Sequence, residues 1–187
     1  YVWVLTNRKP ARRKGKVQLI DATQWFKPLR KNLGKKNCEL SAEDIDRICA
    51  TFLAFEESEQ SKIFPNEAFG YHKVIVERPL RLKGIEPDRA YSPAEIKRLK
   101  ESAERSENGI PVIRKVHKDK QADPLNGLFV ATVGGKQVVV EYEPDTELRD
   151  TENIPLLEEG GISAFIQREV LPHVPDAWIV PDKIQVG

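Results

Sequence analysis

Two strand-like runs joined by a strongly basic loop open the chain and limit how its first residues can fold. Residues 2–5 and 17–20 are rich in valine, leucine and isoleucine, and residues 8–16 between them hold six lysines and arginines but no acid. Apolar, β-branched runs bounded by Pro and Gly favour strands. We therefore predict strands at about residues 2–6 and 16–21, paired as a hairpin that the basic loop closes.

Two helices are predicted after this hairpin. The first is short: Asp21 or Thr23 can cap it, it runs through residues 25–29, and Gly34 ends it. The second begins at Ser41, whose hydroxyl can accept a hydrogen bond from the third amide of the helix. Apolar residues then recur every three or four positions and form one face, at positions 45, 48, 49, 52 and 53.

A strand and a third helix are predicted on either side of a polar linker. Residues 71–76 alternate as a strand does, and Pro79 closes the run because proline cannot donate to a ladder. Residues 84–91 are polar and contain proline, so we expect the main internal boundary there. Ser92 and Pro93 then start a helix with the sequence of a capping box.

The last third of the chain contains the clearest hairpin signal. Gly134 and Gly135 separate two β-rich runs and can adopt the positive φ angles of a tight hairpin turn. A short helix is predicted over residues 161–171, followed by a buried run at residues 178–180. The signals together predict an α+β fold.

Composition indicates a globular protein of the cytoplasm. The 187 residues are 40% hydrophobic and 32% charged, and no apolar run is long enough to cross a membrane. Only Cys38 and Cys49 occur, whereas a secreted scaffold usually carries several cysteine pairs, so we expect reduced thiols. The chain starts with Tyr1 and contains no methionine, and we expect the natural N-terminus to lie upstream.

Charge is distributed unevenly although the net charge is only +1. Residues 1–40 hold eleven lysines and arginines against two acids, and residues 141–160 hold eight acids against one arginine. Such asymmetry is typical of a protein with one face toward phosphate and another toward solvent or a protein partner. The alternative is that the basic loop is simply solvated. The candidate phosphate contacts are Arg8, Lys9, Arg12, Arg13, Lys14 and Lys16.

Other chemistry finds little support in the sequence. The three histidines, at positions 72, 117 and 173, lack the spacing of metal ligands, and no CxxC pair occurs, so we predict no metal site. Neither cysteine has a neighbouring base that would make it a nucleophile. Glu77 and Arg78 are either a functional pair or ion-pair partners at a strand end, and the second interpretation is favoured.

Three segments of the sequence resemble one family. They are YVWVLTNRKPARRKGKVQLIDA at residues 1–22, KIFPNEAFGYHKVIVERPLRLK at residues 62–83, and TENIPLLEEGGISAFIQREVLPHVPDAWI at residues 151–179. In this order they resemble the modification subunit of type I restriction-modification systems, a DNA adenine N6-methyltransferase. The first is similar to the segment that follows the family's catalytic motif. Residues 84–125 contribute nothing to the resemblance.

The resemblance implies an enzyme that transfers a methyl group from S-adenosylmethionine to the N6 amine of an adenine turned out of the DNA stack. Its partners would be DNA, the specificity subunit and the restriction subunit. The Asn-Pro-Pro-Phe or Asn-Pro-Pro-Tyr motif of such enzymes is missing here, because Pro-Pro never occurs. Their glycine-rich cofactor turn is missing too, because the two glycine pairs lie in the predicted hairpin and before a predicted helix, at residues 134–135 and 160–161. We therefore expect no catalytic, cofactor-binding or metal-binding residue in this chain, which would be an inactive C-terminal fragment.

The implied organisation has three parts. Residues 1–24 would be the last two strands of a Rossmann-like methyltransferase sheet, residues 25–83 a block of helices and strands, and residues 84–187 the C-terminal region. A severed sheet edge tends to pair with another copy, so self-association is also expected. The alternatives are a stand-alone, non-catalytic DNA-binding or subunit-docking module, and a different DNA methyltransferase or restriction enzyme fused to its own specificity region. An Asn-Pro-Pro-Phe or Asn-Pro-Pro-Tyr motif encoded upstream of Tyr1 would support the modification subunit, and its absence would contradict it.

Overall fold

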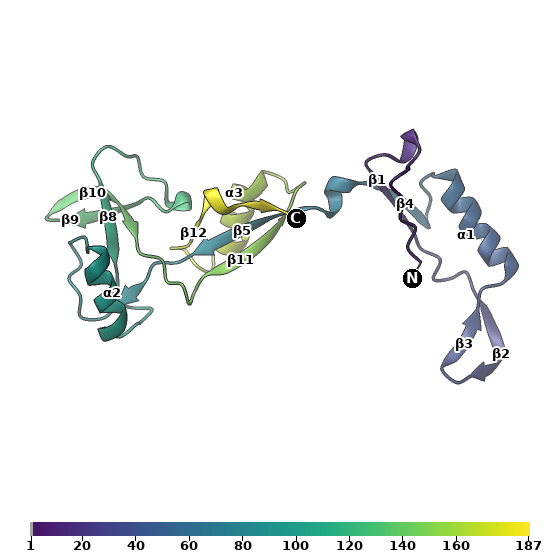
Figure 1. Cartoon of the computed structure of the whole chain (residues 1–187), viewed down its shortest axis with the longest axis horizontal. Coiled ribbons are helices and arrows are strands. Elements are labelled where there is room, and N and C mark those ends of the chain that lie inside the picture. The colour runs from purple at the N-terminus through teal and green to yellow at the C-terminus, as the bar shows by residue number, and fades with distance from the viewer. Residues whose placement is uncertain (1) are drawn as a thin grey trace. The chain divides into compact units, whose positions relative to one another are not determined.

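The computed structural model describes residues 2–187 and, except at Leu33, their side chains. The fold is mixed α+β, with three α-helices and several small antiparallel sheets in the described residues (Figure 1). The chain divides into two compact units, Tyr1–Phe69 (unit 1) and Gly70–Gly187 (unit 2). This division lies upstream of the polar linker at residues 84–91, where we expected the boundary, because that linker joins elements of unit 2 that share a core.

The first strand of unit 1 has a different partner from the one expected. Strand β1 (Lys16–Ile20) pairs antiparallel with β4 (Ser61–Pro65), with Val17 opposite Phe64. Residues 2–10 form no regular element, and Ala11–Arg13 form a single 3₁₀ turn. The predicted hairpin of residues 2–6 with 16–21 is therefore wrong, since β1 finds its partner far along the chain.

Helix α1 (Ala42–Ala54) confirms the prediction from Ser41. The Ser41 hydroxyl accepts from the amide of Asp44, and the Asp44 carboxylate accepts from the Ser41 amide, which completes a capping box. Phe55 ends the helix in the left-handed conformation with φ of 55°. None of the helix residues is buried, and Cys49, on the predicted apolar face, is exposed.

A β-hairpin replaces the short helix that was expected around residues 25–29. It pairs β2 (Lys27–Leu33) with β3 (Lys36–Glu39) through the two-residue connection of Gly34 and Lys35. Gly34 has a φ of 62°, which suits the first position of a tight hairpin turn. Proline at position 28 and the absence of a helical apolar stripe after it favour the extended form.

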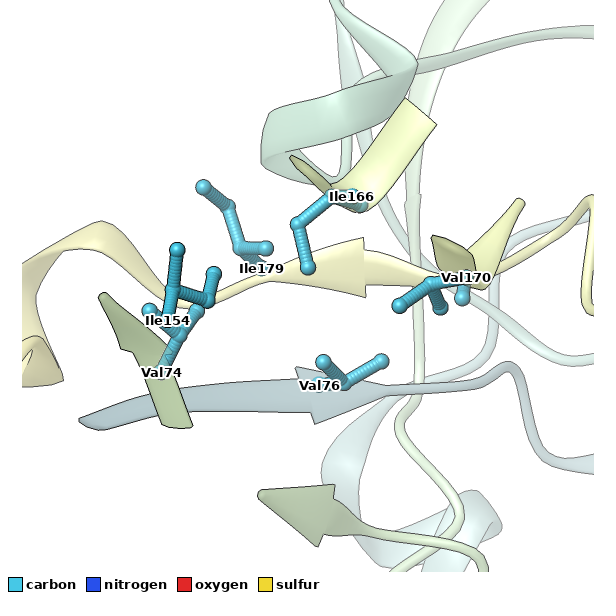
Figure 2. Close-up of a cluster of buried hydrophobic side chains, with 7 residues drawn as sticks. Val74, Val76, Ile154, Ile166, Val170 and Ile179 are labelled. Atoms are coloured by element: carbon cyan, nitrogen blue, oxygen red, sulfur yellow. The ribbon is translucent and has the colours of Figure 1, made fainter. Parts of the chain in front are cut away.

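A small sheet and a helical segment form the first core of unit 2. Strand β5 (Tyr71–Glu77) pairs with β11 (Asp150–Pro155) on one side and with β12 (Trp178–Ile179) and β13 (Gln185–Val186) on the other. Helix α3 (Gly161–Phe165) continues into a π-helical turn, Ile166–Val170. Figure 2 shows the core side chains between these elements: Val74, Val76, Ile154, Ile166, Val170 and Ile179.

A second core of unit 2 lies under helix α2 (Pro93–Ser102). Ile96 of this helix packs in a cluster with Leu82 of strand β6 (Arg81–Leu82), which pairs with β7 (Ile110–Pro111). The buried side chains of this core are Leu80, Leu82, Tyr91, Ile96 and Val112.

A three-stranded sheet completes unit 2. Its strands, in the order β8-β10-β9, are β8 (Ile113–His117), β10 (Lys136–Tyr142) and β9 (Phe129–Val133). Gly134 and Gly135 connect β9 to β10 with φ angles of 56° and 74°, which confirms the predicted hairpin. None of the helices in the described part of the chain has the length and apolar character that a bilayer crossing requires.

The capping box of α2 makes the stability of unit 2 depend on pH. Glu95 accepts hydrogen bonds from the amide and hydroxyl of Ser92 and from Arg89, and these bonds lower its pKa from 4.5 to about 2. A carboxylate with a lowered pKa stabilises the fold above its unfolded value and loses that contribution as the pH falls toward the folded value. We expect melting temperatures to fall between pH 4.5 and about 2. Glu95→Gln should flatten this dependence, whereas Glu101→Gln, on an exposed position of the same helix, should leave it unchanged.

Candidate nucleic-acid interface

The structure divides the six candidate cations of residues 8–16 into two groups. Arg12 and Arg13 point at the end of helix α1: Arg12 donates to the carbonyls of Leu53 and Ala54 at 2.7 and 3.1 Å, and Arg13 donates to that of Phe52. The last four carbonyls of a helix have no partner within it, and its C-terminus carries partial negative charge. These two arginines therefore stabilise unit 1, and each uses both of its terminal nitrogens in hydrogen bonds within it.

Aromatic rings hold Arg13 in place. Its guanidinium carbon lies 4.3 Å from the ring centroid of Phe52 and 4.2 Å from that of Phe55, and its Nη1 donates to Gln18 at 3.1 Å. Partial burial, together with repulsion from Arg12, lowers the Arg13 pKa. The side chain nevertheless stays charged, because an arginine is not deprotonated in proteins. Arg13 is the least available of the six for a ligand.

The other four cations of the loop make fewer hydrogen bonds within the chain. Lys9 is half-buried and donates from Nζ to the carbonyl of Lys16 at 2.7 Å. Arg8, Lys14 and Lys16 are exposed, and their side chains contact no acid or hydrogen-bond acceptor in residues 2–187. Of the residues predicted from the sequence, these three remain best suited to meet phosphate.

The β2–β3 hairpin adds five cations that count toward the basic charge of residues 1–40 but are not among the predicted phosphate contacts. All five are exposed, and none takes part in an ion pair with a described residue: Lys27, Arg30, Lys31, Lys35 and Lys36. A short helix was expected around residues 25–29, so no hairpin was predicted that would bring these five cations together. The sequence feature that indicates this hairpin is Gly34, which lies in a two-residue connection between two basic runs.

Unit 2, in contrast to unit 1, forms many ion pairs between its own side chains. All ion pairs among the described residues lie between positions 77 and 176. Five of the eight acids in residues 141–160 are used in them; Glu143 binds Lys100 at 2.6 Å, and Asp145 binds Arg105 at 3.2 Å. The acidic segment is thus largely neutralised within its own unit, whereas the basic surface of unit 1 is not.

Glu77 and Arg78 have separate partners. Glu77, at the end of β5, is buried and accepts from Arg149, and Arg78 lies 3.7 Å from Asp176, which also binds Arg81 at 2.9 Å. These contacts tie neighbouring elements of unit 2 together. They favour the ion-pair interpretation of Glu77 and Arg78.

Neither a metal cluster nor a relative is found. Residues 2–187 contain no group of three or more histidines, cysteines or acids placed to hold a metal ion. No family model, curated protein or solved structure matches the chain. Function therefore has to be inferred from the residues and their geometry.

Proposed function

We propose that unit 1 binds the phosphates of DNA, and that the chain is the C-terminal part of the modification subunit of a type I restriction-modification system. The observation that carries the DNA-binding role is the contrast in charge pairing. The exposed cations of unit 1 have no acidic partner among the described residues, whereas unit 2 pairs about half of its charges internally. Unpaired cations on a protein surface release counterions from a nucleic acid when they meet it.

The lack of a core in unit 1 supports the idea that it belongs to a larger enzyme. No described apolar side chain of residues 2–69 is buried, and Val2, Trp3, Val4 and Leu5 are 62 to 91% exposed. Strand β1 pairs with β4 on one edge, and no strand of residues 2–187 pairs with its other edge, where a sheet can be extended. In the parent enzyme, β1 would be one of the last strands of the Rossmann-like methyltransferase sheet.

In this proposal the chain positions DNA and leaves the chemistry to the rest of the subunit. The parent would bind S-adenosylmethionine and hold the extruded adenine in a pocket built around an Asn-Pro-Pro motif that this chain lacks. Phosphate contacts fix the register of a protein on the duplex without reading sequence. Choice of the target sequence would belong to the specificity subunit. A stand-alone DNA-binding or docking module is the alternative, because phosphate binding needs none of the catalytic motifs.

The DNA-binding role predicts a defined change in salt dependence. Replacing Arg8, Lys14 and Lys16 together by Ala should flatten the plot of log affinity against log salt by up to about 0.9 for each phosphate that is no longer neutralised. The preferred sequence should not change, because these residues are expected to meet phosphate only. Arg12 and Arg13 are left intact, since they support helix α1. Fluorescence anisotropy with a labelled duplex at several salt concentrations measures the slope.

A charge-matched variant provides the control. Lys118, Lys120 and Lys136 are exposed cations of unit 2 without an ion pair to a described residue, and their replacement by Ala changes the net charge equally. We expect this variant to keep the parental slope. Equal salt slopes for the parental chain, the loop variant and this control would contradict the proposal, because the loop would then be a solvated surface that does not meet phosphate.

A further inference from the structure

The β2–β3 hairpin is an element without a packing partner in its own unit. Its strands pair only with each other, and none of its described side chains is buried. Figure 1 shows it extending away from α1, β1 and β4. An isolated two-stranded hairpin is marginally stable in water. A surface outside unit 1 is therefore needed to hold this hairpin in one position.

The positive charge of the hairpin indicates the charge that this outside surface must carry. Residues 27–39 hold five lysines and arginines and one acid, Glu39. None of the five cations forms an ion pair with a described residue, so their mutual repulsion is not relieved within the chain. A partner that stabilises the hairpin must supply dense negative charge.

The shape and composition of the hairpin favour duplex DNA over other polyanions. The major groove is about 12 Å wide and admits a two-stranded β-ribbon. Asn32 and Asn37 lie close to the turn, and asparagine can both donate to and accept from base edges. Residues 27–39 contain no aromatic residue, whereas proteins that hold single strands stack bases on aromatic rings.

We propose that the β2–β3 hairpin enters the major groove of duplex DNA while the loop of residues 8–16 contacts phosphates elsewhere on the same duplex. This inference rests on the proposed DNA-binding function and extends it to a second element with a different role. Lys31, Lys35 and Lys36 surround the turn at Gly34 and would lie deepest in the groove. Gly34 has open space around its Cα, so a base pair or phosphate can approach the backbone there.

The test compares two triple variants of the full chain on the same short mixed-sequence duplex. The hairpin variant replaces Lys31, Lys35 and Lys36 by Ala, and the loop variant replaces Arg8, Lys14 and Lys16 by Ala. Each should lose at least about tenfold in affinity near 0.1 M salt, since three cations leave the DNA surface. The same sequence as a single strand should bind the parental chain more weakly than the duplex does.

Chemical protection of guanine N7 then locates the hairpin, because this atom lies in the major groove. At saturating protein, the parental chain and the loop variant should protect N7 from dimethyl sulfate, whereas the hairpin variant should not. Unprotected N7 with the parental chain, or stronger binding to the single strand, would overturn the inference. If only the loop variant loses affinity, the hairpin inference fails while the proposed function stands. If neither variant loses affinity, the proposed function itself fails.

Discussion

Residues 70–187 expressed alone should fold cooperatively, whereas residues 1–69 expressed alone should show no cooperative unfolding transition. All buried apolar side chains of the described chain lie between Val74 and Ile179, and the only buried residue among the described ones of unit 1 is Ser61. A domain of this small size buries about 60% of its unfolded surface even when well packed, and without a core it cannot offset the entropy of ordering its chain. Unit 1 therefore depends on surfaces that the isolated segment lacks.

Urea titration followed by circular dichroism measures both fragments under the same conditions. Residues 70–187 serve as the control and should give a sigmoidal transition, because their two apolar cores are complete within the fragment. Residues 1–69 should lose signal gradually, as α1 and the β1–β4 pair melt without a shared core. A sharp transition for residues 1–69 would show that this segment finds a core of its own, and the proposal that it belongs to a larger sheet would lose its support.

Local signals explain which elements could be predicted from the sequence. Ser41 and Ser92 each begin a helix through a capping box that lies within four consecutive residues. Gly134 and Gly135 define a turn in the same local way. Each of these features is set by neighbours along the chain, so the amino-acid pattern is enough to find it.

Long-range pairing explains the errors. The alternation in residues 16–20 identifies a strand but does not say which strand it pairs with, and its partners in β4 lie 41 to 49 positions further on. Proximity along the chain favours residues 2–6 as the partner, although a partner close in sequence is only the more frequent outcome. The hairpin of β2 and β3 is hidden for another reason: the possible caps at Asp21 and Thr23 indicate a helix and compete with the turn signal at Gly34.

The candidate site was likewise only partly predictable. Counting charges identified the basic loop, but the role of a single cation depends on what the fold brings near it. Arg12 donates to Ala54, which lies 42 residues away, so its use as a helix cap follows from the position of α1 and from nothing in the loop itself. The count therefore located a charged surface but could not separate structural arginines from accessible ones.

The same dependence on long-range contacts makes Leu80 the position at which a single substitution should destabilise the protein most. Leu80 is fully buried, and its backbone joins two segments that are distant in sequence: its amide donates to the carbonyl of Glu143 at 2.7 Å and its carbonyl accepts from the amide of Val112 at 2.9 Å. Leu80→Ala keeps these backbone hydrogen bonds but leaves a cavity in the core that Tyr91 and Ile96 share with it.

We expect Leu80→Ala to lower the free energy of unfolding of unit 2 by about 2–5 kcal/mol, as buried leucine-to-alanine changes generally do. Since domains are usually stable by only about 5–15 kcal/mol, this is a large fraction of the total, and the melting temperature should fall by on the order of 10 °C. Leu157→Ala is the matched control, because this leucine is 61% exposed and should be nearly neutral. Urea denaturation of the full chain, followed by tryptophan fluorescence from the buried Trp178, measures both variants. Similarly small decreases in the free energy of unfolding for the two variants would contradict this prediction, because they would show that the core under α2 is not tightly packed around Leu80.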